Sequence, residues 1–227
     1  VIQLGEQPDR VFCVGALGVE NIKNMPLLSK EQLEREIDFS LQGRFALVTF
    51  HPVTLENNTT EQQFEKLLSA LDATKDLKIV FTKANADTEG RTINSMIDAY
   101  ADKNKDRAIA FTSMGQLKYL SAMKYADAVI GNSSSGIVEG PALCVPTVNI
   151  GDRQKGRIMG ESIVNCAPER KDIIKAINLC LSAEFKNKIK SLQSPYGQGD
   201  TSCRIADIIK DFLYNNKIDL KKHFYDL

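Results

Sequence analysis

The sequence predicts an α/β fold in which a Rossmann-like parallel sheet carries helices on both faces. Short runs rich in β-branched and aromatic residues are apolar throughout, as in strands that are buried on both sides. Between them stand longer segments whose apolar residues recur every three or four positions, as in amphipathic helices. Strands and helices that alternate in this way build a parallel sheet, because a parallel pair needs a crossover connection.

The expected elements follow one another in regular order. Strands are predicted at 11–14, 45–50, 77–82, 108–111, 128–130 and 145–150, with 162–164 as a shorter candidate. Helices are predicted at 59–73, 91–102, 115–125, 137–143, 169–181 and 204–215. Thr59 and Gln62 have the spacing of a capping box at the start of the first helix. Residues 21–42, with Pro26 and few apolar positions, are interpreted as a connector, and 191–202 as a loop.

The charge balance limits the possible partners. Lys plus Arg and Asp plus Glu both total 29, so the formal net charge is zero. Without a basic excess there is no electrostatic reason to bind nucleic acid or an anionic membrane. No apolar run approaches the roughly 18 residues that a membrane-spanning helix needs. We therefore expect neither partner, and any bound anion requires a local cluster of donors.

The cysteines indicate where the protein is located, and the first residues indicate whether the chain is part of a longer protein. The five cysteines are far apart, form no C-x-x-C pair and stand mostly in apolar stretches. This pattern predicts reduced, buried thiols in a cytoplasmic protein, and it argues against a metal site. The chain starts without Met, and we expect it to be part of a longer protein.

Four segments of unusual composition follow predicted strands. They are residues 50–54, 83–87, 131–140 and 151–157. In an open α/β sheet, ligands bind beyond the carboxyl ends of the strands. These four segments are therefore the places where we expect binding residues.

Residues 131–140, GNSSSGIVEG, lead from a buried strand into a helix through an Asn, three Ser and a Gly. The first turn of a helix presents unpaired amide N–H groups and the positive end of the dipole. Ser133, Ser134 and Ser135 add hydroxyl donors, so the segment predicts a phosphate cradle. The simpler alternative is that one Ser caps the helix and the others decorate a loop.

Charged and imidazole side chains complete the predicted site. Glu139 either complements the helix dipole in the first turn or accepts hydrogen bonds from a ribose diol. Arg153, Lys155 and Arg157 crowd one short loop, where they are either solvated or form a diphosphate clamp centred on Arg153. His51 precedes a Pro and ends a strand, which predicts a phosphate donor or a leaving-group acid; a purely structural His is the alternative.

Other functional classes fit the sequence less well. Neither G-x-G-x-x-G nor a Walker P-loop is present, which argues against NAD binding and ATP hydrolysis. A serine hydrolase with Ser134, an Asp and His223 would keep the chain order of the α/β-hydrolase triad. The nucleophile elbow G-x-S-x-G is not matched, however, and His223 stands in a charged tail.

Four longer motifs carry a family resemblance. They read VIQLGEQPDRVFCVG at 1–15, LVTFHPVTLE at 47–56, VIGNSSSGIVEG at 129–140 and PTVNIGDRQKGR at 146–157. In this order and spacing they resemble the UDP-N-acetylglucosamine 2-epimerase family, above all its hydrolysing branch in sialic-acid pathways. The resemblance extends over essentially the whole chain but covers only the second half of the family's length. It implies the C-terminal domain of a glycosyltransferase-B type fold.

The resemblance also implies domains, partners and roles. Residues 1–42 would be the end of the first domain and a connector, 43–205 the nucleotide-binding domain, and 206–227 a helix and tail that return towards the first domain. UDP and UDP-N-acetylglucosamine are the implied ligands, without a cofactor; the missing N-terminal domain and a homo-oligomer are the implied protein partners. The residues implied to hold UDP are Asn85, Phe111, Thr112, Ser113, Ser133, Ser134, Glu139 and Arg153, with His51 at the phosphates as the catalytic candidate.

The implied reaction removes the proton at C2 of the sugar and expels UDP to give a glycal, to which water adds to release N-acetylmannosamine. The acids for these proton transfers are implied in the first domain, so this chain alone is expected to bind nucleotide and to catalyse almost nothing. Three alternatives stay open: a non-hydrolysing epimerase, a hydrolysing epimerase for another nucleotide sugar such as a diacetamido or GDP-linked one, and a non-catalytic binding module.

Overall fold

The computed structural model describes residues 1–53, 59–85, 88–215, 217–219 and 221–226. Of the segments discussed above, Thr54, Leu55, Glu56, Ala86 and Asp87 lie outside the described residues. Within the described part, six parallel strands form one sheet in the order β3-β2-β1-β4-β5-β6. The strands are β1 (Arg44–Thr49), β2 (Leu77–Thr82), β3 (Ala108–Phe111), β4 (Ala128–Gly131), β5 (Thr147–Ile150) and β6 (Ile163–Cys166).

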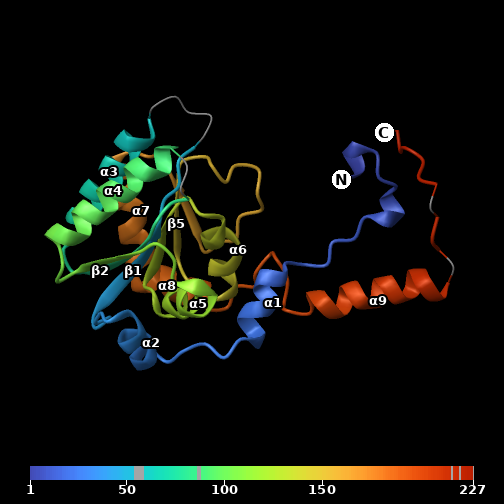
Figure 1. Ribbon diagram of the computed structural model, residues 1–227, viewed down its shortest axis with the longest axis horizontal. Coiled ribbons are helices and arrows are strands. Elements are labelled where there is room, and N and C mark those ends of the chain that lie inside the picture. The colour runs from blue at the N-terminus through green and yellow to red at the C-terminus, as the bar shows by residue number, and fades with distance from the viewer. Residues whose placement is uncertain (54–58, 86–87, 216, 220, 227) are drawn as a thin grey trace.

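Helices connect and flank these strands (Figure 1). They are α1 (Leu17–Asn24), α2 (Lys30–Ile37), α3 (Thr60–Asp72), α4 (Thr88–Lys103), α5 (Gly115–Tyr125), α6 (Ser134–Ala142), α7 (Arg170–Leu181), α8 (Ala183–Ile189) and α9 (Thr201–Tyr214), preceded by two short 3-10 turns, η1 (Ile2–Leu4) and η2 (Pro8–Arg10). The predicted parallel sheet with helices on both faces is confirmed. Among the described residues, no helix combines the length and apolar character needed to cross a membrane.

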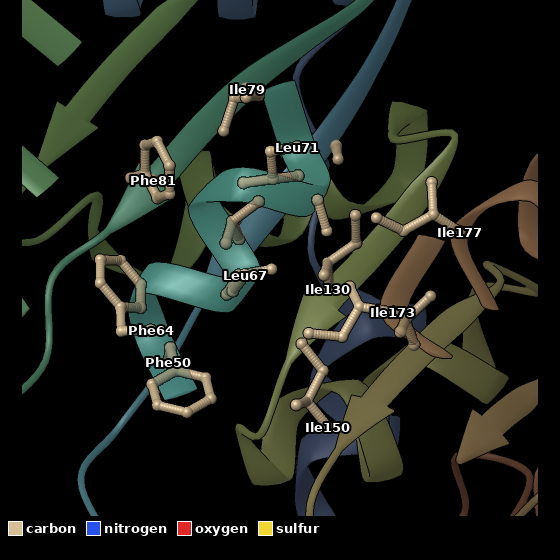
Figure 2. Packing of buried hydrophobic residues seen from close by; sticks show 14 of the residues in the cluster. Phe50, Phe64, Leu67, Leu71, Ile79, Phe81, Ile130, Ile150, Ile173 and Ile177 are labelled. Carbon is tan, nitrogen blue, oxygen red and sulfur yellow. The ribbon is translucent and has the colours of Figure 1, made fainter. Parts of the chain in front are cut away.

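The sheet is buried on both faces. On one face, α3, α4 and α7 pack on the strands; in the cluster of Figure 2, Phe64 of α3 lies beside Phe50, and Leu67 of α3 belongs to the same cluster as Ile130 and Ile150 of the sheet. On the other face, α2 and α5 cover Phe45, Leu47 and Val80 in a second cluster. Full burial of one large apolar side chain contributes roughly 1.5–3 kcal/mol, so these two layers fix the strand register.

Residues 21–42 are more than the connector predicted from their composition. They hold the end of α1 and all of α2, and Leu33, Ile37 and Leu41 are buried in the second core cluster. Ser29 and Gln32 form a reciprocal capping box at the start of α2. Thr59, where a capping box was predicted, makes no side-chain cap bond to the backbone of α3. Helices of eight residues carry too few apolar positions to show a period, which is why α2 escaped prediction.

The predicted strand at 11–14 is wrong. These residues lie outside the sheet and run beside α9, so that the two segments form an arm (Figure 1). Phe12 packs edge-on against Phe212, with ring centroids 5.8 Å apart, and Arg204 Nη2 donates to the carbonyl of Cys13 at 3.0 Å. β-propensity reports how a side chain fits a pleated surface, and here no strand lies alongside to supply that surface.

The cysteines also differ in part from expectation. All five are unpaired, but Cys13 and Cys203 are exposed on the arm, and Cys180 is the one that is fully buried. Burial raises the pKa of Cys166 and of Cys180 to about 12, so these two thiols are unreactive. The apolar neighbours of Cys13 in the sequence suggested burial, but they pack along the arm instead of inside the sheet domain.

Candidate functional site

The candidate site lies at the carboxyl edge of the sheet, which points to the top of Figure 1. The strand order is the one found in doubly wound nucleotide-binding sheets, in which the direction of winding reverses between β1 and β4. Ligands bind beside that reversal. The loops after β1 and β4, which carry His51 and the serines, stand on either side of it.

Asn132 joins these two loops. It is 1% exposed, its Oδ1 accepts from the amide of His51 at 2.7 Å, and its Nδ2 donates to the carbonyl of His51 at 2.8 Å. Both ends of one side chain thus bond to one backbone residue across the reversal point. The backbone of His51 is held at the start of the serine loop.

The loop after β5 reaches the same residue. Arg153 Nη1 and Gln154 Nε2 both donate to the backbone carbonyl of Asn132, at 3.1 and 2.7 Å. The predicted clamp residue Arg153 therefore lies against the predicted phosphate loop. The structure brings His51, the serine loop and Arg153 together, as the sequence predicted.

Gly131 permits this close approach. Its φ is 136°, and a Cβ there would lie 1.9 Å from the carbonyl oxygen of Thr49, the last residue of β1. Only Gly adopts this backbone conformation without strain, and no side chain would fit. Gly131 therefore lets β4 end directly against β1, which delivers Asn132 to His51.

The serine loop is the start of α6. The helix begins at Ser134 rather than at the predicted Ile137, and Ser133 is its N-cap, with Oγ accepting from the amide of Ser135 at 3.4 Å. One serine therefore caps the helix, as the simpler interpretation held. For the hydroxyl of Ser134, no hydrogen-bond partner is found in the described part of the chain. The unpaired amides of the first turn and this hydroxyl stand at the carboxyl edge, where an anion would be stabilised.

Two glycines press α6 onto β5. Cβ atoms at Gly136 and Gly140 would each lie 2.8 Å from the side chain of Thr147, whose Oγ1 donates to the carbonyl of Gly136 at 3.0 Å. The helix axis thus comes closer to the sheet than side chains would allow. The first turn of α6 is consequently fixed beside the ends of β4 and β5.

Glu139 stands in the second turn of α6, because the helix starts earlier than predicted. The proposed role as a partner of the dipole in the first turn is therefore wrong. Burial raises the pKa of Glu139, and hydrogen bonds from Ser135 and from its own backbone partly oppose this rise. Its Oε1 would be 2.9 Å from a Cβ at Gly18 of α1, so the connector packs directly on this carboxyl group.

Arg153 and Arg157 concentrate positive charge beside the serine loop. Partial desolvation and then repulsion from Arg157 lower the pKa of Arg153, whose guanidinium remains a cation at neutral pH. The repulsion between the two cations is unfavourable, and a bound anion would reduce it. The local field therefore favours a phosphate group at this edge.

A row of hydroxyl groups beneath the serine loop was missed from the sequence. Thr82 and Thr49 pair through their Oγ1 atoms. Burial raises the pKa of Tyr119, while hydrogen bonds from Ser135 and Thr49 act in the opposite direction. Thr49 and Thr82 end neighbouring strands, but Tyr119 comes from α5, and no pattern in the sequence marks it as their neighbour.

The remaining predicted residues lie further along the edge. Asn85, after β2, is exposed, and Asn94 holds its loop by accepting from the amide of Ala84 at 2.8 Å and donating to the Ala84 carbonyl at 3.1 Å. Phe111 is the last residue of β3 and is partly buried, and Thr112 and Ser113 follow it and are exposed. Since β3 is separated from β1 by β2, this group lies roughly 10 Å from the reversal point, about the length of a nucleoside.

The described residues form neither a serine-hydrolase triad nor a metal site. His223 is exposed in the tail, where its carbonyl accepts from Gln7 at 3.4 Å. The tail runs beside the first residues of the chain, apart from α6 (Figure 1). The triad of a serine hydrolase is therefore absent from the part of the chain that the structure describes. Nor do the described residues include a cluster of His, Cys, Asp and Glu that could hold a metal ion.

The fold is a Rossmann-like domain of the kind found in glycosyltransferase-B type proteins, and the first turn of α6 and Arg153 meet at the carboxyl edge of its sheet. The family model for UDP-N-acetylglucosamine 2-epimerase matches residues 1–210, and the chain belongs to that family. A curated relative from Campylobacter jejuni, GDP/UDP-N,N'-diacetylbacillosamine 2-epimerase (hydrolyzing), is 42% identical over 100% of this chain. The chain spans 58% of that relative's length.

Solved structures share the fold at low sequence identity. The structure of S. aureus MnaA with UDP has a TM-score of 0.69 at 17% identity, over 99% of this chain and 60% of that one. E. coli ADP-heptose heptosyltransferase II has a TM-score of 0.51 at 12% identity, over 69% of this chain and 53% of that one. At these identities the likeness establishes the architecture, and the function has to be argued from the site.

Proposed function

We propose that this chain is the UDP-binding half of a hydrolysing UDP-sugar 2-epimerase. The observation that carries the proposal is the convergence of three loops on Asn132, which sets His51, the first turn of α6 and Arg153 around one point of the sheet edge. That point gathers helix amides, hydroxyls and a guanidinium, which is the donor set that a diphosphate needs.

The same arrangement suits a leaving group. When the bond between C1 of the sugar and the diphosphate oxygen breaks, negative charge grows on UDP, and donors already in place stabilise it. The roles we propose are donors to the diphosphate for Ser133, Ser134 and Arg153, an acceptor for the ribose diol at Glu139, and a phosphate contact or leaving-group acid at His51. Asn85 and residues 111–113 would face the base end of the nucleotide.

Two sugars are candidates for the group attached to UDP, and both carry an acetamido group at C2. We propose a UDP-linked 2-acetamido sugar, with UDP-N-acetylglucosamine as the simplest member. The 42% identity to a relative named for diacetylbacillosamine favours a diacetamido sugar as a second candidate. Hydrolysis is proposed over simple epimerisation because that relative is named as hydrolysing. The five unpaired thiols support a cytoplasmic location, where disulfides are rare.

The proposal is tested by titrating the purified chain with UDP in a calorimeter, with NAD as the control and GDP as a probe of base selectivity. We expect saturable binding of UDP and none of NAD. A chain shown to be folded by circular dichroism that takes up no UDP would sink the proposal for this domain. GDP binding as tight as that of UDP would keep the diphosphate site and remove the uracil assignment.

Hydrolysis needs a separate assay with a protein of the relatives' full length. Incubation with UDP-N-acetylglucosamine, or with the diacetamido sugar nucleotide, should release UDP and the free 2-epimeric sugar. Release of an epimerised sugar that is still attached to UDP would identify the non-hydrolysing alternative. Binding of UDP without turnover of either substrate would favour the binding module.

A further inference from the structure

We infer that Asn132 and Gln154 are positioning residues that set the relative placement of the three phosphate-facing loops, a role that rests on the proposed function. Both side chains are neutral amides, and neither is assigned a chemical step of the reaction. Their contribution would be to hold His51, the start of α6 and Arg153 in one arrangement before the nucleotide arrives.

The Asn132 side chain can do this because its two ends have opposite hydrogen-bonding roles. Oδ1 accepts from the amide of His51 and Nδ2 donates to the carbonyl of the same residue, at 2.7 and 2.8 Å. Asp would lack the donor, and Ser would be too short to span both groups. At 1% exposure no bulk water can replace the lost bonds, so removal of the amide would break both hydrogen bonds between Asn132 and the backbone of His51.

The backbone carbonyl of Asn132 connects this residue to the third loop. It accepts from Gln154 at 2.7 Å and from Arg153 at 3.1 Å, which ties the loop after β5 to the same residue. The guanidinium of Arg153 belongs to an exposed residue and can turn towards a ligand, whereas Gln154 is 2% exposed. Gln154 therefore supplies the permanent contact and Arg153 the adjustable one.

The hydrogen bonds of Gln154 indicate that the fold requires its Nε2 donor rather than its Oε1 acceptor. Its Oε1 is buried and has no hydrogen-bond partner among the described residues, while Nε2 is bonded to Asn132. A buried, unpaired carbonyl oxygen is unfavourable, and a nonpolar residue of the same size would avoid it. Retention of an amide at this cost is explained if the bond to the loop carrying the serines matters more than the unsatisfied oxygen.

Loop placement matters because a diphosphate must meet its donors in a defined geometry. A displacement of about 1 Å in such a site lowers rates by roughly a hundredfold, and binding through several short hydrogen bonds is similarly sensitive. The three loops belong to separate crossovers, so nothing in the local sequence keeps them in register. Asn132 is the residue that all three share.

The test compares Asn132→Ala and Gln154→Met with Asn104→Ala in the full 227-residue chain. Asn104 is the matched control, because its Nδ2 donates to the carbonyl of Tyr100 at 2.9 Å within the turn that ends α4, away from the site. Binding of UDP is measured by calorimetry. Amide chemical shifts of His51, 133–135 and 152–155 are measured by NMR without ligand.

We expect Asn132→Ala to weaken UDP binding by about tenfold or more and to shift the amides of all three loops. Gln154→Met should weaken binding less, by roughly threefold to tenfold, without loss of stability, since it removes the unsatisfied oxygen with the donor. Asn104→Ala should leave both readouts at wild-type values. The Met variant keeps the test decisive even if Asn132→Ala does not fold.

Two results would overturn the inference: UDP affinity within about twofold of wild type in both site variants, or amide shifts confined to the substituted loop. If the wild-type chain binds no UDP, the proposed function fails instead, and the amide shifts still decide whether Asn132 couples the loops. The two failures are therefore distinguishable.

Discussion

At the scale of single residues, several groups of the proposed site also serve the fold. Ser133 caps α6 with its hydroxyl, while Ser134 at the first helical position keeps its hydroxyl available at the sheet edge. Glu139 is partly buried between α6 and α1, and its raised pKa shows that the fold disfavours its charge. Residues kept in such unfavourable states are the ones to test for a role in binding.

Replacement of Ser133 and Ser134 together by Ala should weaken UDP binding, since each hydrogen bond to a charged group contributes roughly 1.5–3 kcal/mol. Loss of the Ser133 cap should also cost about 1 kcal/mol of stability. Calorimetric titration and urea unfolding measure the two effects. Ser182→Ala is the control, because Ser182 caps α8 by accepting from the amide of Phe185 at 3.2 Å, outside the site. Unchanged affinity in the double variant would reduce the serines to a helix cap.

Glu139→Gln should make the protein more stable at neutral pH. The folded-state pKa of Glu139 is raised, so its stabilising contribution is present below the ordinary Glu pKa and is lost as pH rises through the raised value. Gln removes that loss, and urea unfolding from pH 4 to pH 8 should show a flatter profile than wild type. An unchanged profile would contradict the assignment of the raised pKa.

The ribose contact of Glu139 is tested with a ligand control. The wild-type chain should bind UDP more tightly than 2'-deoxy-UDP, because a carboxylate accepts from vicinal hydroxyls. In the Gln variant the ratio of the two affinities should fall by roughly tenfold, which corresponds to about 1.4 kcal/mol. If wild type and variant show the same preference, the ribose lies elsewhere.

At the scale of elements, glycines decide how closely strands and helices approach at the site. Gly131 brings the end of β4 against β1, and Gly136 and Gly140 bring α6 against Thr147 of β5. The register of β1 with β4 pairs Thr49 with Gly131, so the contact stands at the last paired position of both strands. These contacts fix the first turn of α6 beside the ends of β4 and β5.

Gly131→Ala should destabilise the protein by more than about 4 kcal/mol, since the new methyl group would meet the backbone of Thr49 at 1.9 Å and the φ of 136° is unfavourable for Ala. Gly43→Ala is the matched control, with φ at 83° and open space around the added Cβ. It should cost only about 1–2 kcal/mol of backbone strain. Equal unfolding free energies for the two variants would show that the close approach is not required.

At the scale of the whole molecule, a sheet domain that carries the proposed site is joined to an arm with exposed apolar side chains. Ile209 and Leu213 of α9 are 53% and 56% exposed, and with Phe12 and Phe212 they line an open apolar cavity of about 340 Å³. Such a surface agrees with the predicted return of the last helix to a first domain, which stays a prediction. The proposed site stands at the carboxyl edge of the sheet, and α6 lies on the side of the sheet domain nearer the arm (Figure 1).

The chain of 227 residues should bind UDP and release none from UDP-N-acetylglucosamine, because the acids for proton transfer are implied outside it. Coupled detection of free UDP over several hours measures turnover, and a protein of the relatives' full length is the positive control. Steady release by this chain, abolished by the serine double variant, would place the proton-transfer groups within these residues and contradict the expected division of labour.

Much of the fold could be read from the sequence because its signals are local. All six strands, including β6 from the shorter candidate at 162–164, and the helices at 59–73 and 115–125 follow from apolar runs and helical periods, which arise from burial of continuous segments. The strand at 11–14 failed because strand formation depends on a neighbour that the local sequence does not contain. Helix α2 failed because eight residues are too few to establish a period.

The sequence by itself determined the family, the parallel α/β class and the loops that meet at the sheet edge, since residue types after each strand are visible without coordinates. Only the tertiary structure decided that Asn132 joins these loops, that Tyr119 lies beneath the serines, and that Glu139 stands in the second turn of α6. These facts depend on contacts between residues far apart in the chain, and on where a helix begins once the whole sheet is packed.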